Sequence, residues 1–177
     1  MYYICSYPNA KNMQYYAALL LFFCTAVLSA QPRTELTPSG FTVVQNSTPA
    51  LGPEKLIELS NAWATYYNKK GADVFNVSAN ALTIEAMREN AFFYRNLGEI
   101  YQHDIRYALA IEFGPDNIYT MRFTVKEIYI DNVLLPTSMA DYFLTDGTPK
   151  EDFEDVKPSI ELSANNILKS FAAFIER

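Results

Sequence analysis

The chain has 177 residues, of which 14 are basic and 20 acidic, so its formal charge is −6 at neutral pH. An acidic chain without a lysine and arginine cluster does not present the cationic surface that binds nucleic-acid phosphates. The cysteines, Cys5 and Cys24, both lie near the N-terminus, so the rest of the chain forms no disulfide or thiolate metal site. Hydrophobic residues make up 50% of the sequence, which is typical of a packed globular domain.

An uncharged stretch, Asn12–Pro32, stands near the start of the chain. Its apolar part runs from about Tyr15 to Leu28, which is shorter than the roughly 20 residues that cross a membrane as a helix. The length and the small residues that follow are typical of a signal peptide. We therefore expect residues 1–30 to be removed by cleavage between Ala30 and Gln31, leaving no membrane span.

Other readings of this stretch stay open. An uncleaved N-terminal anchor is the main alternative, and the true start could be Met13 instead of Met1. Lipoprotein processing at Cys24 requires a small residue before the cysteine, and Phe23 stands there. The cleaved signal peptide is the interpretation that we adopt.

The mature chain has the length of one domain. Residues 31–40 are rich in proline, threonine, serine and glycine, which predicts a flexible lead-in. A single domain is expected over residues 41–177, and its first strand over residues 41–45.

The clearest helical signal is the stretch "GPEKLIELSNAWATYYNKKG". Pro53 is suited to the first turn of a helix and Gly71 to the position just past its end. Leu56, Leu59 and Trp63 recur at helical spacing and form an apolar stripe. We expect Trp63 to anchor this helix on a sheet rather than to bind a ligand.

Strands follow the helix. Residues 74–77 and 81–87 flank a turn and predict a hairpin, whereas residues 89–102 fit either a strand with a wide loop or a packed aromatic loop. Residues 105–113 and 119–125 alternate in polarity on either side of the turn at residues 114–117.

The alternation changes parity after the second of these strands, which predicts a β-bulge near Lys126 and Glu127. Beyond it, residues 137–144 predict a short helix and residues 146–155 an acidic turn. Residues 159–176 predict an amphipathic C-terminal helix with Ser159 as its cap. This order of elements is typical of an α+β domain of two layers, with helices on one face of an antiparallel sheet.

Three stretches resemble a family. The helix "LIELSNAWATYY", the segment "ADVFNVSANALTIEA" and the hairpin "IRYALAIEFGPDNIYTMRFTVKEI" resemble a domain of unknown function with a TBP-like fold, found in exported proteins of Bacteroidetes. The likeness covers residues 41–130, with Trp63 and Arg122 as its main markers, and leaves residues 131–177 as a helical extension. The chain departs from the family pattern at Asn80 and Ala81, where a glycine-bearing turn is usual, and residues 89–102 look like an insertion. The resemblance implies no activity and no catalytic residue.

The sequence contains no recognisable catalytic set. His103 is the single histidine, so a histidine metal site lacks partners, and we expect it at the surface or at a strand edge. Glu85 and Glu112 lie on the polar sides of predicted strands, which are typically solvated. The acidic residues between 146 and 155 lack the spacing of a calcium loop. We therefore predict no catalytic residue, no metal site and no cofactor.

Four residues are candidates for binding. Arg106 and Arg122 lie on the polar side of the predicted hairpin and could form a small cationic patch, although pairing of Arg122 with Glu112 is favoured. Phe93 and Tyr94 belong to an aromatic-rich stretch that could form a contact surface.

The leading functional hypothesis is a non-enzymatic domain exported to the periplasm or cell envelope of a Gram-negative bacterium. Its partner would be an envelope protein or a small ligand, bound on the sheet face or the aromatic stretch. A carboxylate-dependent hydrolase of envelope glycans is the alternative, and requires two carboxylates about 5–10 Å apart across a cleft. An inhibitor or assembly subunit is a third possibility.

Overall fold

The computed structural model describes residues 33–177, and only these are discussed below. The predicted signal peptide and its cleavage site between Ala30 and Gln31 lie outside the described residues. These described residues belong to one compact unit. None of its helices combines the length and apolar character needed to cross a membrane.

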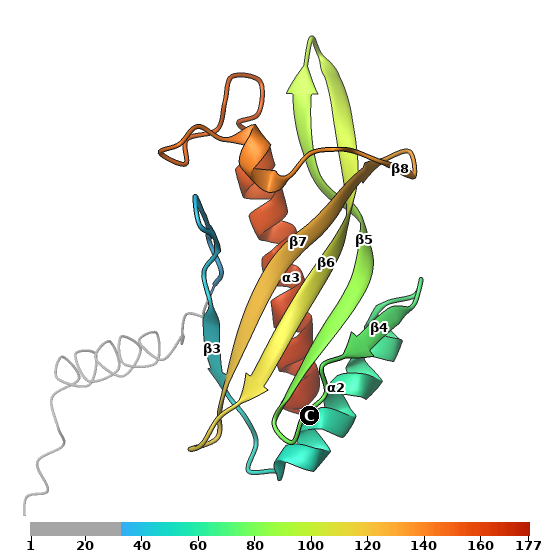
Figure 1. The fold of residues 1–177 in the computed structure, drawn as a ribbon, viewed down its shortest axis with the longest axis vertical. Coiled ribbons are helices and arrows are strands. Elements are labelled where there is room, and N and C mark those ends of the chain that lie inside the picture. Colours follow the sequence, from blue (N-terminus) through green and yellow to red (C-terminus); the bar gives the residue numbers. More distant parts are fainter. Residues whose placement is uncertain (1–32) are drawn as a thin grey trace, which may run out of the picture. The chain divides into compact units, whose positions relative to one another are not determined.

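The described unit is built on a six-stranded antiparallel sheet (Figure 1). Five strands follow the order β3-β7-β6-β5-β4, and the sixth, β8, pairs with β7. The strands are β3 (Val44–Ser47), β4 (Ala72–Phe75), β5 (Ala81–Asn96), β6 (Glu99–Phe113), β7 (Ile118–Ile130) and β8 (Val133–Leu134). The helices are α2 (Pro53–Tyr67) and α3 (Val156–Ile175). A short 3₁₀ helix, η1 (Met139–Tyr142), stands between β8 and α3.

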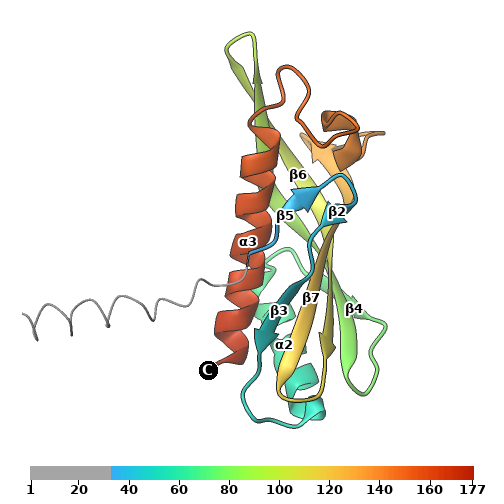
Figure 2. The same ribbon diagram turned by 90° about the vertical axis from the view of Figure 1, so that its left-hand side faces the viewer.

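Both helices pack on the same face of the sheet, as the amphipathic patterns require. The inward side of β6 consists of residues with almost no exposed surface: Ile105, Tyr107, Leu109, Ile111 and Phe113. Phe171 of α3 contacts both Tyr119 of the sheet and Trp63 of α2, with ring centroids 5.7 and 5.2 Å away. The predicted α+β two-layer fold is therefore confirmed, and α3 runs along the sheet in both views (Figures 1 and 2).

Trp63 links the two helices. Its side chain is 1% exposed, stacks on Tyr67 at 5.0 Å and donates a hydrogen bond from Nε1 to Ser170 Oγ at 3.2 Å. The expected anchoring role is thus seen, but its ring and hydrogen-bond contacts join α2 to α3, and Phe171 carries the connection on to the sheet.

The predicted bulge is confirmed. Arg106 pairs with Glu127 and Tyr107 pairs with Val125, so Lys126 is the extra residue on β7. The bulge restores the alternation, because Ile128 then lies on the buried side with Phe123. A parity change in an alternating sequence is direct evidence of an inserted residue, since side chains alternate strictly along a strand.

The lead-in differs from the sequence-based expectation. Residues Leu36–Thr37 (β1) and Gly40–Phe41 (β2) form a small hairpin, and Leu36 is only 7% exposed. The backbone N–H groups of Thr34 and Leu36 donate to side-chain oxygens of Asn165 and Glu161 on α3. This stretch is therefore packed from Thr34 onward instead of flexible. The expected strand over residues 41–45 is correspondingly divided between β2 and β3.

The C-terminal region also needs a correction. α3 begins at Val156, with Asp155 as its N-cap residue, so the expectation that Ser159 caps the helix was wrong. Ser159 lies inside the helix, and its hydroxyl donates to the carbonyl of Asp155 at 2.6 Å. The predicted short helix over residues 137–144 is the 3₁₀ helix η1.

Candidate functional site

The segment that the sequence left open, residues 89–102, belongs to a long β-hairpin. After a bulge, β5 and β6 pair from Phe92 opposite His103 to Asn96 opposite Glu99. Neither neighbouring strand follows this far, because β4 stops opposite Ala86 and β7 opposite Asp104. We call residues 92–103 the arm; it extends beyond the end of the sheet (Figure 1).

The bulge sets where the arm begins. Glu89, Asn90 and Ala91 of β5 lie opposite Asp104 alone. Asn90 adopts a positive φ of 49°, a conformation that asparagine tolerates better than most residues, and its N–H donates to Asp104 Oδ1 at 2.8 Å. A wide bulge of this kind bends and twists a strand locally, which redirects the arm relative to the sheet.

Aromatic rings hold the base of the arm. Tyr94 stacks on Tyr101 across the strands at 5.1 Å and meets Phe153 edge-on at 4.8 Å. Phe92 stacks on His103 at 4.7 Å and meets Tyr142 of η1 edge-on at 5.4 Å. The segment after β8 therefore contributes to a continuous cluster under the arm.

His103 is part of this cluster, so its expected place at the surface or at a strand edge was wrong. Its side chain is 2% exposed, and Nδ1 lies 3.1 Å from the carbonyl oxygen of Tyr101. It lies on the inward side of β6 with Ile105 and Tyr107. These three residues alternate along the strand, so the sequence already placed them on the same face. Burial lowers the pKa of His103 below its usual value, because the charged imidazolium is poorly solvated there.

The lowered pKa of His103 predicts that the fold weakens in mild acid. The unfolded chain takes up a proton near pH 6.5 and the folded chain only at lower pH, so the free energy of unfolding falls as the pH drops below about 6.5. The slope is at most about 1.4 kcal/mol per pH unit. Urea unfolding at pH 7.5 and pH 5.5 measures it, and His103→Gln should remove it. An equal slope in His103→Gln would show that other groups cause the effect.

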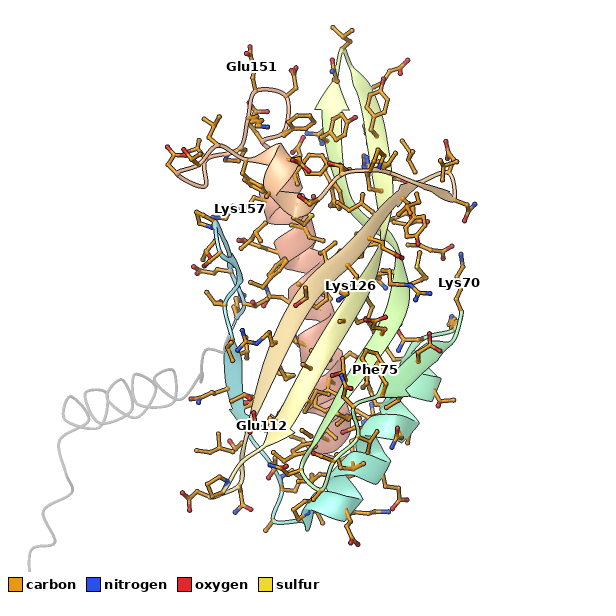
Figure 3. The ribbon with its side chains drawn as sticks, viewed as in Figure 1. Lys70, Phe75, Glu112, Lys126, Glu151 and Lys157 are labelled. Atoms are coloured by element: carbon orange, nitrogen blue, oxygen red, sulfur yellow. The ribbon has the colours of Figure 1, made fainter. Side chains whose placement is uncertain are left out.

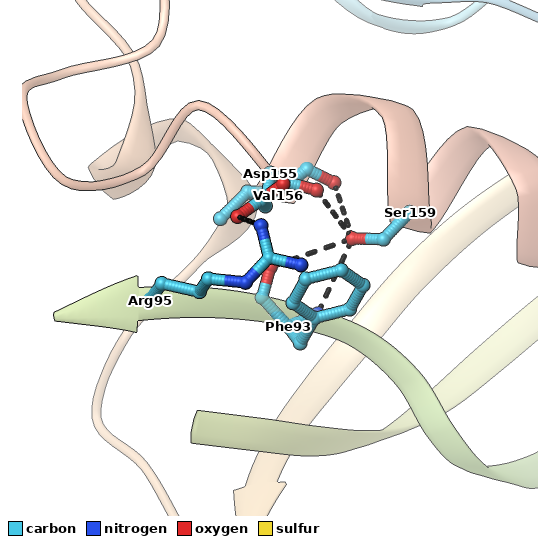
Figure 4. Close-up of polar contacts among 5 residues, drawn as sticks. All are labelled: Phe93, Arg95, Asp155, Val156 and Ser159. Carbon is cyan, nitrogen blue, oxygen red and sulfur yellow. Dashed lines mark hydrogen bonds and ion pairs between the residues drawn. The ribbon is translucent and has the colours of Figure 1, made fainter. Parts of the chain in front are cut away.

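The arm is fastened to α3 (Figure 4). Ser159 Oγ accepts the N–H of Phe93 at 3.2 Å, and Ser163 Oγ donates to the carbonyl of Ala91 at 2.6 Å. The guanidinium of Arg95 pairs with Asp155 at 2.8 Å and lies over the ring of Phe93 at 5.2 Å. These helix side chains satisfy backbone groups on the edge of β5 where no strand pairs with it, which protects that edge.

The tip of the arm is apolar and exposed. Leu97 and Gly98 form the turn, and both have positive φ values, 49° and 85°. This turn geometry favours asparagine or glycine at the first position, and a leucine there is conformationally unfavourable. The side chain of Leu97 is nevertheless 100% exposed, and that of Ile100 is 57% exposed.

The face of the sheet away from the helices, which we call the open face, carries most of the polar candidates. Arg106 Nη1 lies 3.8 Å from Glu85 on β5, and Arg106 Nε lies 3.4 Å from Glu127 on β7. The three side chains form a cross-strand charge network at the centre of the sheet. Its two carboxylates compensate the charge of Arg106, so this arginine is engaged within the protein.

Arg122 lies further along the open face. It is exposed, stands opposite Ala110 and forms no ion pair within the described residues, so the expected pairing with Glu112 is not present. Arg122 and Glu112 border a shallow hollow of ≈ 200 Å³ above the small side chains of Thr83, Ala110 and Thr120. Figure 3 labels Glu112 and Lys126 on the strands that form this face.

Glu85 and Glu112, the carboxylates expected on the polar side of the sheet, are not spaced as a glycosidase pair. Glu85 stands opposite Ala108, and Glu112 lies four residues further along β6, which at about 3.3 Å per residue places them roughly 13 Å apart. Retaining and inverting enzymes use separations of about 5–10 Å. The described residues also contain no group of three or more side chains suited to a metal ion.

The four predicted binding residues therefore fall into two regions. Phe93 and Tyr94 lie on the arm, where Tyr94 packs inward and Phe93 sits under Arg95. Arg106 and Arg122 lie on the open face. Leu97 was not among the residues predicted to bind, although the sequence carries a signal for its turn: Tyr94 and Tyr101 stand at equal distances from the Leu97-Gly98 pair.

Comparison with solved structures identifies the fold. A TBP-like protein from Parabacteroides distasonis is similar with a TM-score of 0.56 and 15% identity, over 76% of this chain and 90% of that chain. A DUF4468 family protein from Bacteroides ovatus gives a TM-score of 0.43 and 12% identity, over 83% and 87% of the two chains. No family model and no curated protein matches the sequence. The first similarity confirms the TBP-like fold expected from the sequence.

Proposed function

We propose that this chain is a non-enzymatic domain exported to the envelope of a Gram-negative bacterium, where its arm binds a protein partner. Export is supported by the uncharged, apolar stretch before Ala30, which has the length of a signal peptide. The arm is the favoured contact surface because it combines a supported base with an exposed apolar tip.

The observation that carries this proposal is the exposure of Leu97 at a turn position that disfavours leucine. Its side chain contributes nothing to the core, being 100% exposed, and its φ of 49° is unfavourable for a residue of this shape. Asparagine at this position would be well solvated and would adopt the positive φ of the turn more readily. A residue that is unfavourable in both respects is best explained by a contact with another molecule, in which an apolar anchor enters a pocket.

The experiment is a native mass spectrum of the protein purified from its own host at low protein concentration. We expect a chain mass that begins at Gln31 and an additional mass from a bound protein. Leu97→Asn with Ile100→Thr should abolish the added mass. Leu97→Asn alone should raise the free energy of unfolding by about 0.5–1 kcal/mol, because it relieves the left-handed strain of the turn.

Leu162→Thr is the matched control, since Leu162 is an exposed leucine on α3, away from the arm. It should keep the partner at the wild-type ratio. Retention of the partner by the double variant would rule out the arm tip as the contact. A spectrum of the free chain alone would contradict partner binding, and a mass that includes residues 1–30 would contradict cleavage.

A further inference from the structure

A pocket of ≈ 690 Å³ opens between the end of α2 and the bulge of β5. It is lined by residues 66–70, at and after the end of the helix, and by residues 87–90 of β5. β4 pairs with β5 only from Thr83 to Ala86, so beyond Ala86 that edge of β5 has no strand beside it, while β6 pairs with the other edge. The volume lies in the range of about 300–1,000 Å³ that is typical of small-molecule sites.

Arg88 is the unusual residue of this pocket. It lies on β5 in line with the buried residues Leu82 and Ile84, so its side chain starts from the helix-facing side of the sheet. Its Nε is buried without a hydrogen-bond partner, and no carboxylate of residues 33–177 lies within ion-pairing distance. A partly buried guanidinium without a counter-charge is unfavourable, which indicates an anion supplied from outside the chain.

Two polar side chains of the pocket, those of Lys70 and Asn68, already have partners within the chain. Lys70 Nζ pairs with Glu89 at 2.5 Å on the rim, where Figure 3 labels Lys70. Tyr107 Oη donates to Asn68 Oδ1 at 2.8 Å, and Asn68 Nδ2 donates to the carbonyl of Ala64 at 2.9 Å. The Ala64 carbonyl also accepts the backbone N–H of Asn68 at 3.3 Å, so the Asn68 side chain is held within the chain at the end of α2.

Lys69 is the second free cation. It is exposed, lines the pocket and forms no ion pair with a described residue. Arg88 at the inner side and Lys69 at the outer side are therefore available to one ligand, and Tyr66 and Tyr67 supply aromatic walls. A guanidinium can bind both oxygens of a carboxylate or phosphate at once, which a single ammonium cannot.

We propose that this pocket binds a small organic anion, whose carboxylate or phosphate group is held by Arg88 and Lys69 and whose apolar part lies against Tyr66 and Tyr67. The site is separate from the arm tip, so it does not depend on the partner-binding proposal. Its lining contains three cations, Lys69, Lys70 and Arg88, and one carboxylate, Glu89, in a chain whose formal charge is −6.

The test is a titration of the ¹⁵N-labelled chain with phenyl phosphate and, separately, with benzoate, followed by NMR. We expect saturable shifts of the Arg88 Nε–H signal and of the amides of residues 66–70 with at least one probe. The probe that binds more tightly distinguishes a phosphate from a carboxylate ligand. Arg88→Gln should weaken binding about tenfold or more, and Lys69→Gln by less.

Arg122→Gln is the control, because it removes an exposed arginine from the opposite face of the sheet. It should leave both titrations unchanged. Arg88→Gln should also leave the urea midpoint unchanged or higher, since Arg88 has no protein counter-charge. A clear loss of stability would assign Arg88 a structural role, and the absence of saturable shifts with both probes would overturn the site.

Discussion

Replacing Trp63 with alanine is expected to lower the free energy of unfolding by about 3–5 kcal/mol, as is usual for a large buried aromatic side chain. The ring is 1% exposed and joins Tyr67 of its own helix to Phe171 of α3. Its loss would leave a cavity at the junction of the two helices and would free the hydroxyl of Ser170. Urea unfolding followed by circular dichroism measures the change.

Tyr66→Ala is the control for this prediction. Tyr66 stands on the same helix, but its side chain is 75% exposed, so the substitution should cost less than about 1 kcal/mol. A loss of similar size in the two variants would mean that α2 is held by its length and helix propensity rather than by Trp63. Trp63→Phe should recover part of the stability, because phenylalanine retains the contact with Phe171 but not the indole N–H.

The elements with a regular hydrophobic period were predictable from the sequence. The alternation in β6 and β7 places Ile105, Tyr107 and Phe123 on one face, and the structure buries all three. The same rule located the bulge at Lys126, because only one register keeps the apolar residues inside. The strand register and the bulge are determined by which side chains are buried, and the hydrophobic period of the sequence indicates which side chains these are.

The arm was not predictable in the same way. Its strands lie beyond the sheet, so their side chains pack on η1 and on the loop before α3 instead of on a continuous core. Such contacts join residues distant in sequence and leave no simple period. The bulge at Glu89–Ala91 also interrupts the alternation of polar and apolar residues along β5. The sequence pattern therefore did not show that the arm continues the preceding strand.

His103 shows the opposite error. Histidine is a polar residue, and the prediction of an exposed side chain followed from this polarity instead of from the position of His103 along the strand. Its odd-numbered place before Ile105 and Tyr107 already indicated the buried face, where stacking on Phe92 accommodates a neutral imidazole. The error in the lead-in is similar, since composition masked the alternating burial of Thr34 and Leu36.

The connection between the arm and α3 gives the second large expected effect. Ser159→Ala with Ser163→Ala removes the partners of the Phe93 N–H and the Ala91 carbonyl. Each lost bond to a buried group costs about 1–3 kcal/mol, and the better helix propensity of alanine returns about 0.5 kcal/mol per site. The net loss of about 1–5 kcal/mol should fall on the arm, because its backbone depends on these serines along the edge of β5 that β4 does not reach.

Hydrogen exchange separates this local effect from general destabilisation. We expect amides of residues 91–102 to exchange about ten- to hundredfold faster, while amides at the centre of β6, such as Leu109, change much less. Asn166→Ala, on the exposed side of α3, is the control and should leave the arm unchanged. Uniformly faster exchange across the sheet would show that α3 and the arm unfold with the whole domain. Faster exchange confined to the arm, together with weaker partner binding, would show that α3 positions the arm. The substitutions loosen only the base of the arm and leave Leu97 and Ile100 chemically intact.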